Sequence, residues 1–259
     1  NFSNLKICVV GETIIDEYID CFPLGMSQEE PIVAFKPVKT ANYIGGAGIV
    51  SSHASRMGSE VSLFSLSGDD KSKELAGKFL AENNVKYQFI VDKNRPTPLK
   101  QRFRSNGSTQ FKISNLSEEP IDVSNQNILI ENINSKIQGF DALIFSDFNY
   151  GLLTNRVITG IIKRAKEVGV FVAADSQSSS QIGDISRFSG VDLITPTERE
   201  ARLALQNKED GLVIIADKLM KKTKCPNIIL KLGENGLIAQ NKDKNTDTIN
   251  ALNENPVDV

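Results

Sequence analysis

Polar side chains recur just beyond the predicted strands, where they could hold a small polar ligand. In open parallel sheets, ligands bind in the crevice outside the carboxyl ends of the strands. Since each of these side chains lies at or just past a carboxyl end, all of them can face one crevice. The set predicts a ligand site at this edge, and it comprises Glu12 and Asp16, Asp147, Asp175, Thr197 with Glu200, and Lys231 with Gly233.

A pair of glycines, Gly45 and Gly46, opens a segment with one apolar helical face. Glycine lets the backbone approach a ligand closely, and the N–H groups of the first helical turn favour anions and hydroxyl oxygens. The pair is therefore a second place for a polar ligand. The alternative is a helix start that needs glycine only for packing.

Three cations alternate along a predicted strand over residues 97–104. Lys100, Arg102 and Arg104 point to one face of that strand, because successive side chains point to opposite faces. Such a face suits an anionic ligand such as a phosphate. A solvated outer face is the alternative.

The elements that position these residues alternate between strand and helix. Apolar runs with short links predict a parallel sheet covered by helices on both faces, and we interpret residues 1–259 as a single α/β domain. The expected strands are 5–10, 61–66, 87–91, 142–145, 170–174, 192–195 and 227–232. The expected helices are 47–57, 71–82, 122–137, 154–168, 197–205 and 211–221.

Two stretches depart from this alternation. Residues 15–40 are interrupted by prolines and glycine, which predicts short strands and turns, and residues 97–114 contain two short strands around a turn. Together they predict a small β lid over the site, with a plain hairpin insertion as the alternative. Residues 241–247 are interpreted as a polar loop.

Composition excludes several classes of protein. The chain has 30 Lys and Arg against 32 Asp and Glu, so no overall basic field favours nucleic acid or an anionic membrane. No apolar run reaches the length of a spanning helix and no leader is recognisable, which predicts a soluble, cytoplasmic protein. Three widely spaced cysteines suit reduced thiols. His53 is the only histidine, which excludes a His-rich metal site.

Along nearly its whole length the chain resembles the ribokinase-like (PfkB) sugar kinases, and within them the branch that phosphorylates heptose 7-phosphate. The resemblance depends on the order and spacing of several motifs rather than on any one of them. Neither a GxxxxGK(S/T) phosphate loop nor a convincing dinucleotide fingerprint is present. The motifs are VVGETIID, GMSQEEPIV, the GGAG helix start with RMG and SGDD, PTPLKQRF, DALIFSDFNYG, DLITPTEREA and KLGENG.

The resemblance implies a ribokinase-like fold and transfer of phosphate from ATP to a sugar hydroxyl. It implies that Asp16 and the glycine pair hold sugar hydroxyls, and that the lid covers the sugar and forms a homodimer. Lys100 and Arg102 suit a phosphate already on the sugar, and we assign Asp147 to the substrate side. On the nucleotide side we assign Asp175, Thr197, Glu200, Lys231 and Gly233, with Glu200 organising Mg²⁺ through water.

Several positions differ from the family pattern. Ile49 and Thr197 stand where asparagine is usual, and Tyr150 and Gln177 stand where lysines are common in the heptose branch. The chain ends at Val259, without the glycine-rich G-A-G-D turn whose aspartate is the general base. We therefore expect the base beyond Val259 and interpret the chain as C-terminally incomplete.

Three functions remain open from the sequence. The first is a kinase for a sugar or sugar phosphate. The second is a non-catalytic sugar or nucleotide binder with the same fold, in which Ile49 and the missing turn abolish transfer. The third is a nucleoside kinase of the same superfamily.

Overall fold

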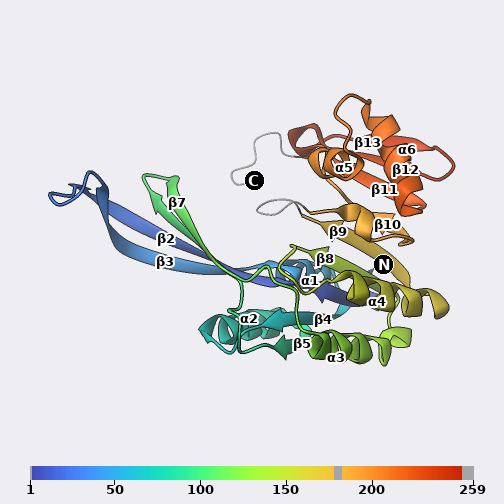
Figure 1. Cartoon of the computed structure of the whole chain (residues 1–259), viewed down its shortest axis with the longest axis horizontal. Helices are drawn as coiled ribbons and strands as arrows, with labels where there is room; N and C mark the ends of the chain where they lie inside the picture. The colour runs from blue at the N-terminus through green and yellow to red at the C-terminus, as the bar shows by residue number, and fades with distance from the viewer. Residues whose placement is uncertain (1, 178–182, 253–259) are drawn as a thin grey trace.

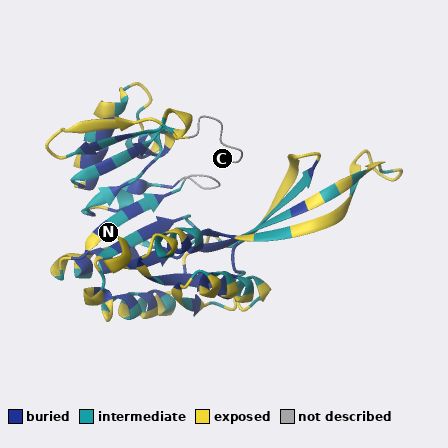
Figure 2. Ribbon diagram, turned by 180° about the vertical axis from the view of Figure 1, so that it is seen from behind, coloured by how far each residue is buried: buried dark blue, intermediate teal, exposed yellow. Residues whose placement is uncertain are grey.

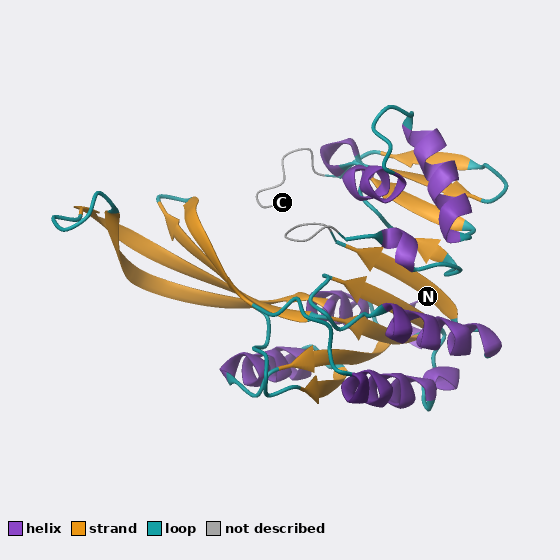
Figure 3. Ribbon diagram, viewed as in Figure 1, coloured by secondary structure: helices purple, strands orange, loops and turns teal. Residues whose placement is uncertain are grey.

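The computed structural model describes residues 2–177 and 183–252 and arranges them around two β-sheets (Figures 1 and 3). The larger sheet has nine strands in the order β13-β12-β11-β10-β9-β8-β1-β4-β5. Its strands are β1 (Lys6–Gly11), β4 (Glu60–Ser67), β5 (Lys86–Val91), β8 (Ala142–Asp147), β9 (Phe171–Ser176), β10 (Leu193–Ile194), β11 (Asn227–Lys231), β12 (Leu237–Asn241) and β13 (Thr246–Ile249). From β11 to β5 all neighbours are parallel, so their carboxyl ends meet at one edge.

Helices cover both faces of this sheet. Cys8 and Val10 of β1 belong to one buried apolar cluster, which joins the sheet to α3, α4, α5 and α6. The alternating residues Ile7 and Val9 belong to a second cluster with α1 and α2, so they lie on the opposite face. The mostly parallel α/β fold with helices on both faces of the sheet is confirmed. The helices are α1 (Ala47–Arg56), α2 (Lys71–Glu82), α3 (Val123–Asn134), α4 (Asn155–Glu167), α5 (Glu198–Leu205) and α6 (Leu212–Thr223), with 3-10 turns η1 (Phe2–Asn4), η2 (Ile137–Gly139), η3 (Ile185–Arg187) and η4 (Gly233–Asn235).

Most helices begin where a side chain can cap them. The side chain of Asp70 accepts a hydrogen bond from the Lys73 N–H at the start of α2, and Asp122 caps α3 in the same way. Thr154 caps α4, as its position in the sequence predicts. These oxygens satisfy N–H groups that lack a partner in the first helical turn. Local chemistry therefore sets the helix starts.

A second, four-stranded sheet has the order β3-β2-β6-β7 and projects as an arm from the carboxyl edge of the first (Figure 1). Its strands are β2 (Thr13–Met26), β3 (Val33–Gly46), β6 (Leu99–Ser105) and β7 (Ser108–Asn115). The outer part of the arm is largely exposed (Figure 2). That this arm closes over a site as a lid stays a prediction.

The expectation of strands and turns over residues 15–40 was right in type but wrong in strand length. β2 and β3 each run for 14 residues. The pairing absorbs the prolines at two register shifts, one next to the Cys21–Pro37 pair and one next to Pro23. Bulges and edge strands tolerate proline because no ladder hydrogen bond is lost there.

The interpretation of residues 241–247 as a loop was also wrong in part. β12 ends at Asn241 and β13 begins at Thr246, so the polar segment is a tight connection in an antiparallel hairpin. All four residues of β13 are exposed, and the strand therefore lacks the apolar alternation by which a sequence reveals strands. Among the residues that the structure describes, no helix is both long enough and apolar enough to span a bilayer.

Candidate functional site

The two sheets meet at Glu12 and Gly46. Glu12 is the single residue between β1 and β2, and Gly46 is the last residue of β3, directly before α1. The Glu12 carbonyl accepts the N–H of Ala47 at 2.8 Å. A Cβ on Gly46, whose φ is +60°, would lie 2.2 Å from that carbonyl oxygen. Glycine is therefore required at position 46 because the Glu12 carbonyl lies too close for a side chain. This agrees with the alternative that the glycine serves packing rather than a ligand.

The Glu12 carboxylate holds the loop that follows β8. Its oxygens accept hydrogen bonds from the N–H groups of Phe148 at 2.9 Å, Leu152 at 3.2 Å and Tyr150 at 3.3 Å. The residue is 1% exposed. Burial and the nearby Asp147 carboxylate raise the pKa of Glu12 to about 7, although the N–H donors of Phe148 and Leu152 act in the opposite direction. Glu12 therefore positions a loop at the site edge.

Asp16 and Gly45 come together at the base of the arm. A Cβ on Gly45 would lie 2.3 Å from Asp16 Oδ2, so the carboxylate lies directly against the Gly45 backbone. Arg102 Nη1 forms an ion pair with Asp16 Oδ1 at 2.5 Å. Both side chains are 22% exposed. A cavity of about 380 Å³ opens beside them, lined by Asp16, Tyr18, Asp20, Lys39, Ala41, Tyr43 and Arg104.

The three cations of β6 contact aromatic rings or carboxylates, so their face is not merely solvated. Arg102 and Arg104 lie over the Tyr18 ring, with their guanidinium carbons 5.0 and 5.6 Å from its centroid. Lys100 Nζ lies 5.4 Å from the centroid of Tyr150 and 5.8 Å from that of Phe148. Lys100 therefore connects the arm to the loop that Glu12 holds.

Asp147 lies in a separate cavity of about 370 Å³ at the end of β8. It is 1% exposed and accepts hydrogen bonds from the Ser176 hydroxyl at 2.8 Å and the Asn149 N–H at 3.0 Å. Arg187 Nη1 lies 3.7 Å from Asp147 and also donates to the Asn149 side chain. Burial raises the pKa of Asp147, and the Arg187 charge opposes this effect. The structure thus does not place Asp147 in the Asp16 cavity.

Asp175, near the end of β9, and Lys231, at the end of β11, come together at the carboxyl edge of the larger sheet. Lys231 Nζ forms an ion pair with Asp175 Oδ1 at 2.7 Å, and the Thr195 hydroxyl donates to the same oxygen at 2.9 Å. The backbones of Lys231 and Thr197 also pair in an isolated parallel β-bridge. The Thr197 N–H donates to Glu200 Oε2 at 2.7 Å, and the Thr197 hydroxyl accepts the Glu200 N–H, which completes a capping box at the start of α5.

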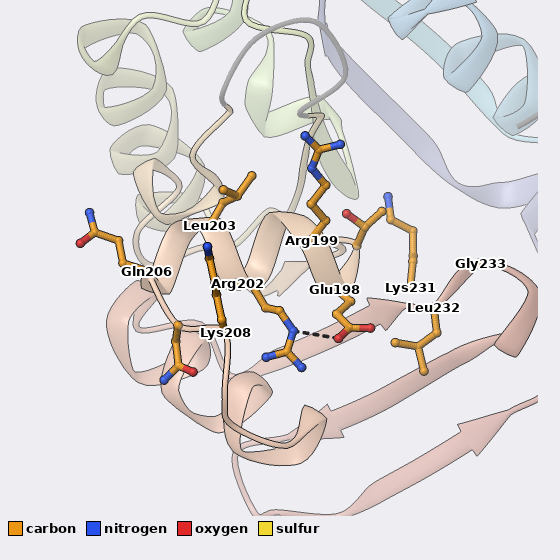
Figure 4. A pocket seen from close by; sticks show the side chains of 11 residues that line it. Glu198, Arg199, Arg202, Leu203, Gln206, Lys208, Lys231, Leu232 and Gly233 are labelled. Atoms are coloured by element: carbon orange, nitrogen blue, oxygen red, sulfur yellow. Dashed lines mark hydrogen bonds and ion pairs between the residues drawn. The ribbon is translucent and has the colours of Figure 1, made fainter.

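A cavity of about 760 Å³ lies beside this second cluster (Figure 4). Three predicted nucleotide-side residues line it, namely Thr197, Lys231 and Gly233. Figure 4 also shows an ion pair between Arg202 and Glu198, with a length of 2.8 Å. Asp175 and Glu200 are not among the lining residues. The remaining lining residues come from α5, the loop after it and the turn after β11: Glu198, Arg199, Arg202, Leu203, Gln206, Asn207, Lys208 and Leu232.

The positions that differ from the family pattern have varied surroundings. Ile49 packs against the second core cluster and lines a cavity of about 180 Å³ with His53. Tyr150 is 1% exposed and lies beneath the Lys100 ammonium. The N–H of Gln177 donates to the Asp147 carbonyl at 2.8 Å. The segment 255–259, on which the expected loss of the G-A-G-D turn depends, lies outside the described residues.

Two groups of predicted residues therefore assemble from distant parts of the chain. Asp16, Gly45, Lys100 and Arg102 gather at the base of the arm, and Asp175, Thr197, Glu200 and Lys231 gather around the end of β11. Sequence reasoning missed Arg187, which lies in an irregular polar stretch without a periodic signal. It also missed Arg202, although its spacing of four residues from Glu198 on a helix was a visible pairing signal.

Comparison with known proteins assigns this chain to a family. The sequence profile of pfkB family carbohydrate kinases matches residues 4–259. The chain belongs to this family. Bifunctional protein HldE of Campylobacter jejuni (strain RM1221) is 33% identical to it over 245 residues, which cover 92% of the chain and 50% of the relative. Bifunctional protein HldE of Desulfatibacillum aliphaticivorans is 28% identical over 240 residues, covering 91% of the chain and 48% of the relative. This pfkB-family chain spans about half the length of these curated relatives.

Solved structures of kinases share the fold of this pfkB-family chain. Phosphofructokinase-2 from Escherichia coli in complex with fructose-6-phosphate superposes with a TM-score of 0.73, covering 95% of this chain and 79% of that one at 14% identity. Ribokinase of Arabidopsis thaliana complexed with ribose and ATP gives a TM-score of 0.69, covering 96% and 78% at 15% identity. At such identities the likeness supports the fold alone.

Proposed function

We propose that this chain binds a sugar phosphate beside Asp16 and ATP beside Lys231, and that it is the kinase portion of a protein that phosphorylates a sugar hydroxyl. The acceptor we favour is a heptose 7-phosphate, on the motif resemblance described above. One observation carries the proposal: the Asp16 carboxylate lines a cavity and forms an ion pair with the Arg102 guanidinium. A carboxylate suits sugar hydroxyls and a guanidinium suits a phosphate.

On the nucleotide side, Lys231 would neutralise phosphate charge and the 760 Å³ cavity would accommodate the nucleotide. The Glu200 carboxylate is a hard oxygen donor, which fits Mg²⁺, and one of its oxygens is already fixed by the Thr197 N–H. Bound Mg²⁺ would neutralise developing charge on the transferred phosphoryl group.

In the proposed reaction, the sugar hydroxyl forms a bond to the γ-phosphorus of ATP and the bond to the β-phosphate oxygen breaks, releasing ADP. The proton of the hydroxyl passes to a general base, a role that we assign to none of the described residues. The residues of this chain contribute position and charge rather than covalent chemistry.

The test is ADP production by the full-length protein with magnesium, ATP and a panel of acceptors. The panel contains heptose 7-phosphate, hexose phosphates and nucleosides. We expect turnover with heptose 7-phosphate. Turnover with nucleosides alone would assign a nucleoside kinase. Binding of sugar and ATP without ADP production would assign a non-catalytic binding protein.

Two substitutions separate the two halves of the site. Asp16→Asn should weaken sugar binding and leave ATP binding nearly intact, whereas Lys231→Met should do the reverse. Binding of each ligand is measured by isothermal titration calorimetry. Asp243→Asn, in the exposed turn between β12 and β13, is the control and should change neither affinity. Equal loss of both ligands in Asp16→Asn would assign Asp16 a structural role.

We also propose that the arm pairs two copies of the chain into a homodimer. One face of the arm carries apolar side chains, including the stacked rings of Phe103 and Phe111 with centroids 4.4 Å apart. Phe111 and Ile113 remain 44% and 46% exposed. Light scattering should give a dimer mass for the wild type and a monomer mass for Phe111→Glu. A wild-type monomer at micromolar concentration would refute the pairing.

A further inference from the structure

The ion pair between Arg102 and Asp16 occupies the carboxylate that the proposed function assigns to sugar hydroxyls. Asp16 Oδ2 lies against the Gly45 backbone and Oδ1 accepts the Arg102 hydrogen bond at 2.5 Å. A neutral sugar would therefore have to compete with a guanidinium for this carboxylate. A hydroxyl can also form a charge-assisted hydrogen bond to the carboxylate, but it lacks the charge attraction that the guanidinium adds. A sugar hydroxyl alone is a poor competitor for Asp16.

The surroundings of Arg102 favour a second anion. Arg104 lies two residues along the same strand, and both guanidinium groups lie over the single Tyr18 ring at 5.0 and 5.6 Å. Lys39 lines the same cavity. The charged residues that line the cavity are Asp16, Asp20, Lys39 and Arg104, and Arg102 lies next to them through its ion pair with Asp16. A phosphate can bridge two neighbouring guanidinium groups through charge-assisted hydrogen bonds.

We infer that the Arg102–Asp16 ion pair is a latch that the phosphate of the substrate opens. The phosphate takes Arg102 as its partner, and the Asp16 carboxylate then accepts hydrogen bonds from the sugar hydroxyls. Arg102 is thereby a specificity-determining residue, which rejects unphosphorylated sugars by blocking Asp16 and admits phosphorylated ones. This inference rests on the proposed sugar site.

The register of the arm explains how one side chain can serve both partners. Asp16 pairs with Lys100 across the β2–β6 ladder. Arg102 pairs with Tyr18, two residues further from the body of the protein. The Arg102 side chain reaches back diagonally to Asp16. Arg102 is two residues from the position opposite Asp16, and its long side chain spans that distance to form the ion pair. Rotation of the side chain alone can exchange the carboxylate for a phosphate in the adjacent cavity.

The first experiment measures sugar binding by calorimetry with heptose and heptose 7-phosphate. Wild-type protein should bind heptose 7-phosphate at least about 100-fold more tightly than heptose, from roughly two charge-assisted hydrogen bonds. Arg102→Gln should bind heptose more tightly than the wild type and heptose 7-phosphate less tightly, so that the ratio falls toward one. Parallel weakening of both ligands would mean that Arg102 orients Asp16, which would overturn the latch.

The control variant for this experiment is Arg104→Gln. Arg104 lies over the same Tyr18 ring but donates a hydrogen bond to the Gly107 carbonyl rather than to Asp16. This variant should weaken heptose 7-phosphate without improving heptose. Improvement of heptose binding in Arg104→Gln as well would mean that general loss of positive charge, rather than release of Asp16, is the cause, and would overturn the latch.

The second experiment requires no sugar and uses inorganic phosphate as the probe. By reciprocity, removing the carboxylate should make Arg102 more available, so Asp16→Asn should bind phosphate about tenfold more tightly than the wild type. Asp16→Asn combined with Arg102→Gln should lose this gain. Unchanged phosphate affinity in Asp16→Asn would overturn the latch, whatever the sugar results. Absence of binding of either sugar to the wild type would instead overturn the proposed function.

Discussion

The buried carboxylate of Glu12 makes the stability of this protein depend on pH between about 4.5 and 7. Its pKa is raised from 4.5 to about 7, chiefly by burial. A raised pKa means that the folded state binds a proton more tightly than the unfolded state does. Stability from this group is therefore fully present below pH 4.5 and is lost as the pH rises to 7. Glu12→Gln removes the ionisable group and should remove this dependence.

The size of the effect follows from the difference between the two pKa values. Since each pKa unit corresponds to about 1.4 kcal/mol, the loss between pH 4.5 and 7 is about 3 kcal/mol. Asp147, whose pKa is also raised, contributes in the same direction, and its repulsion with the Glu12 carboxylate is part of the difference between the two proteins. The quantity to compare is therefore the difference between the unfolding free energies of the wild type and Glu12→Gln, in which other groups largely cancel.

The assay is urea unfolding followed by circular dichroism at half-unit steps from pH 4.5 to 8. Wild-type protein should lose about 3 kcal/mol relative to Glu12→Gln across this window and no more above pH 7. Glu29→Gln, at an exposed position of the turn between β2 and β3, should follow the wild type throughout. A difference between wild type and Glu12→Gln that stays constant across the window would refute the reasoning.

Three further substitutions test the positioning of the site. Gly46→Ala should cost at least about 2 kcal/mol of unfolding free energy, because its Cβ would meet the Glu12 carbonyl at 2.2 Å. Gly169→Ala, also at positive φ but in open space, should cost about 1 kcal/mol. Equal losses in urea titrations would contradict the steric argument. Glu200→Ala should cost about 1 kcal/mol by removing half of the α5 capping box, seen as a lower melting temperature than that of the exposed control Glu209→Ala; identical melting would argue against the box. Leu129→Ala, at 0% exposure, should cost about 2–5 kcal/mol, and its neighbour Ile128→Ala, 43% exposed, much less; a reversed order would misplace α3.

Local signals determined much of the fold. The α2 range of 71–82 and the Thr154 cap were predictable because capping and helical periodicity depend on residues within a few positions of one another. The parallel sheet was predictable from buried strands alternating with helices. The 14-residue strands β2 and β3 were not, because the bulges that accommodate Pro23 and Pro37 exist only once the two strands pair.

Which polar residues could form a site was also visible in the sequence, as the recurrence of carboxylates and cations at strand ends. Which of them touch was decided only by tertiary structure. Asp16 meets Arg102 across 86 positions, and Glu12 meets the loop after β8 across 136 to 140 positions. The register of two sheets sets these contacts, and a one-residue slip would turn each side chain to the opposite face. The sequence alone therefore determined the chemistry available at the edge of the sheet, and tertiary structure decided that Glu12 holds a loop while Asp16 lines a cavity at the base of the arm.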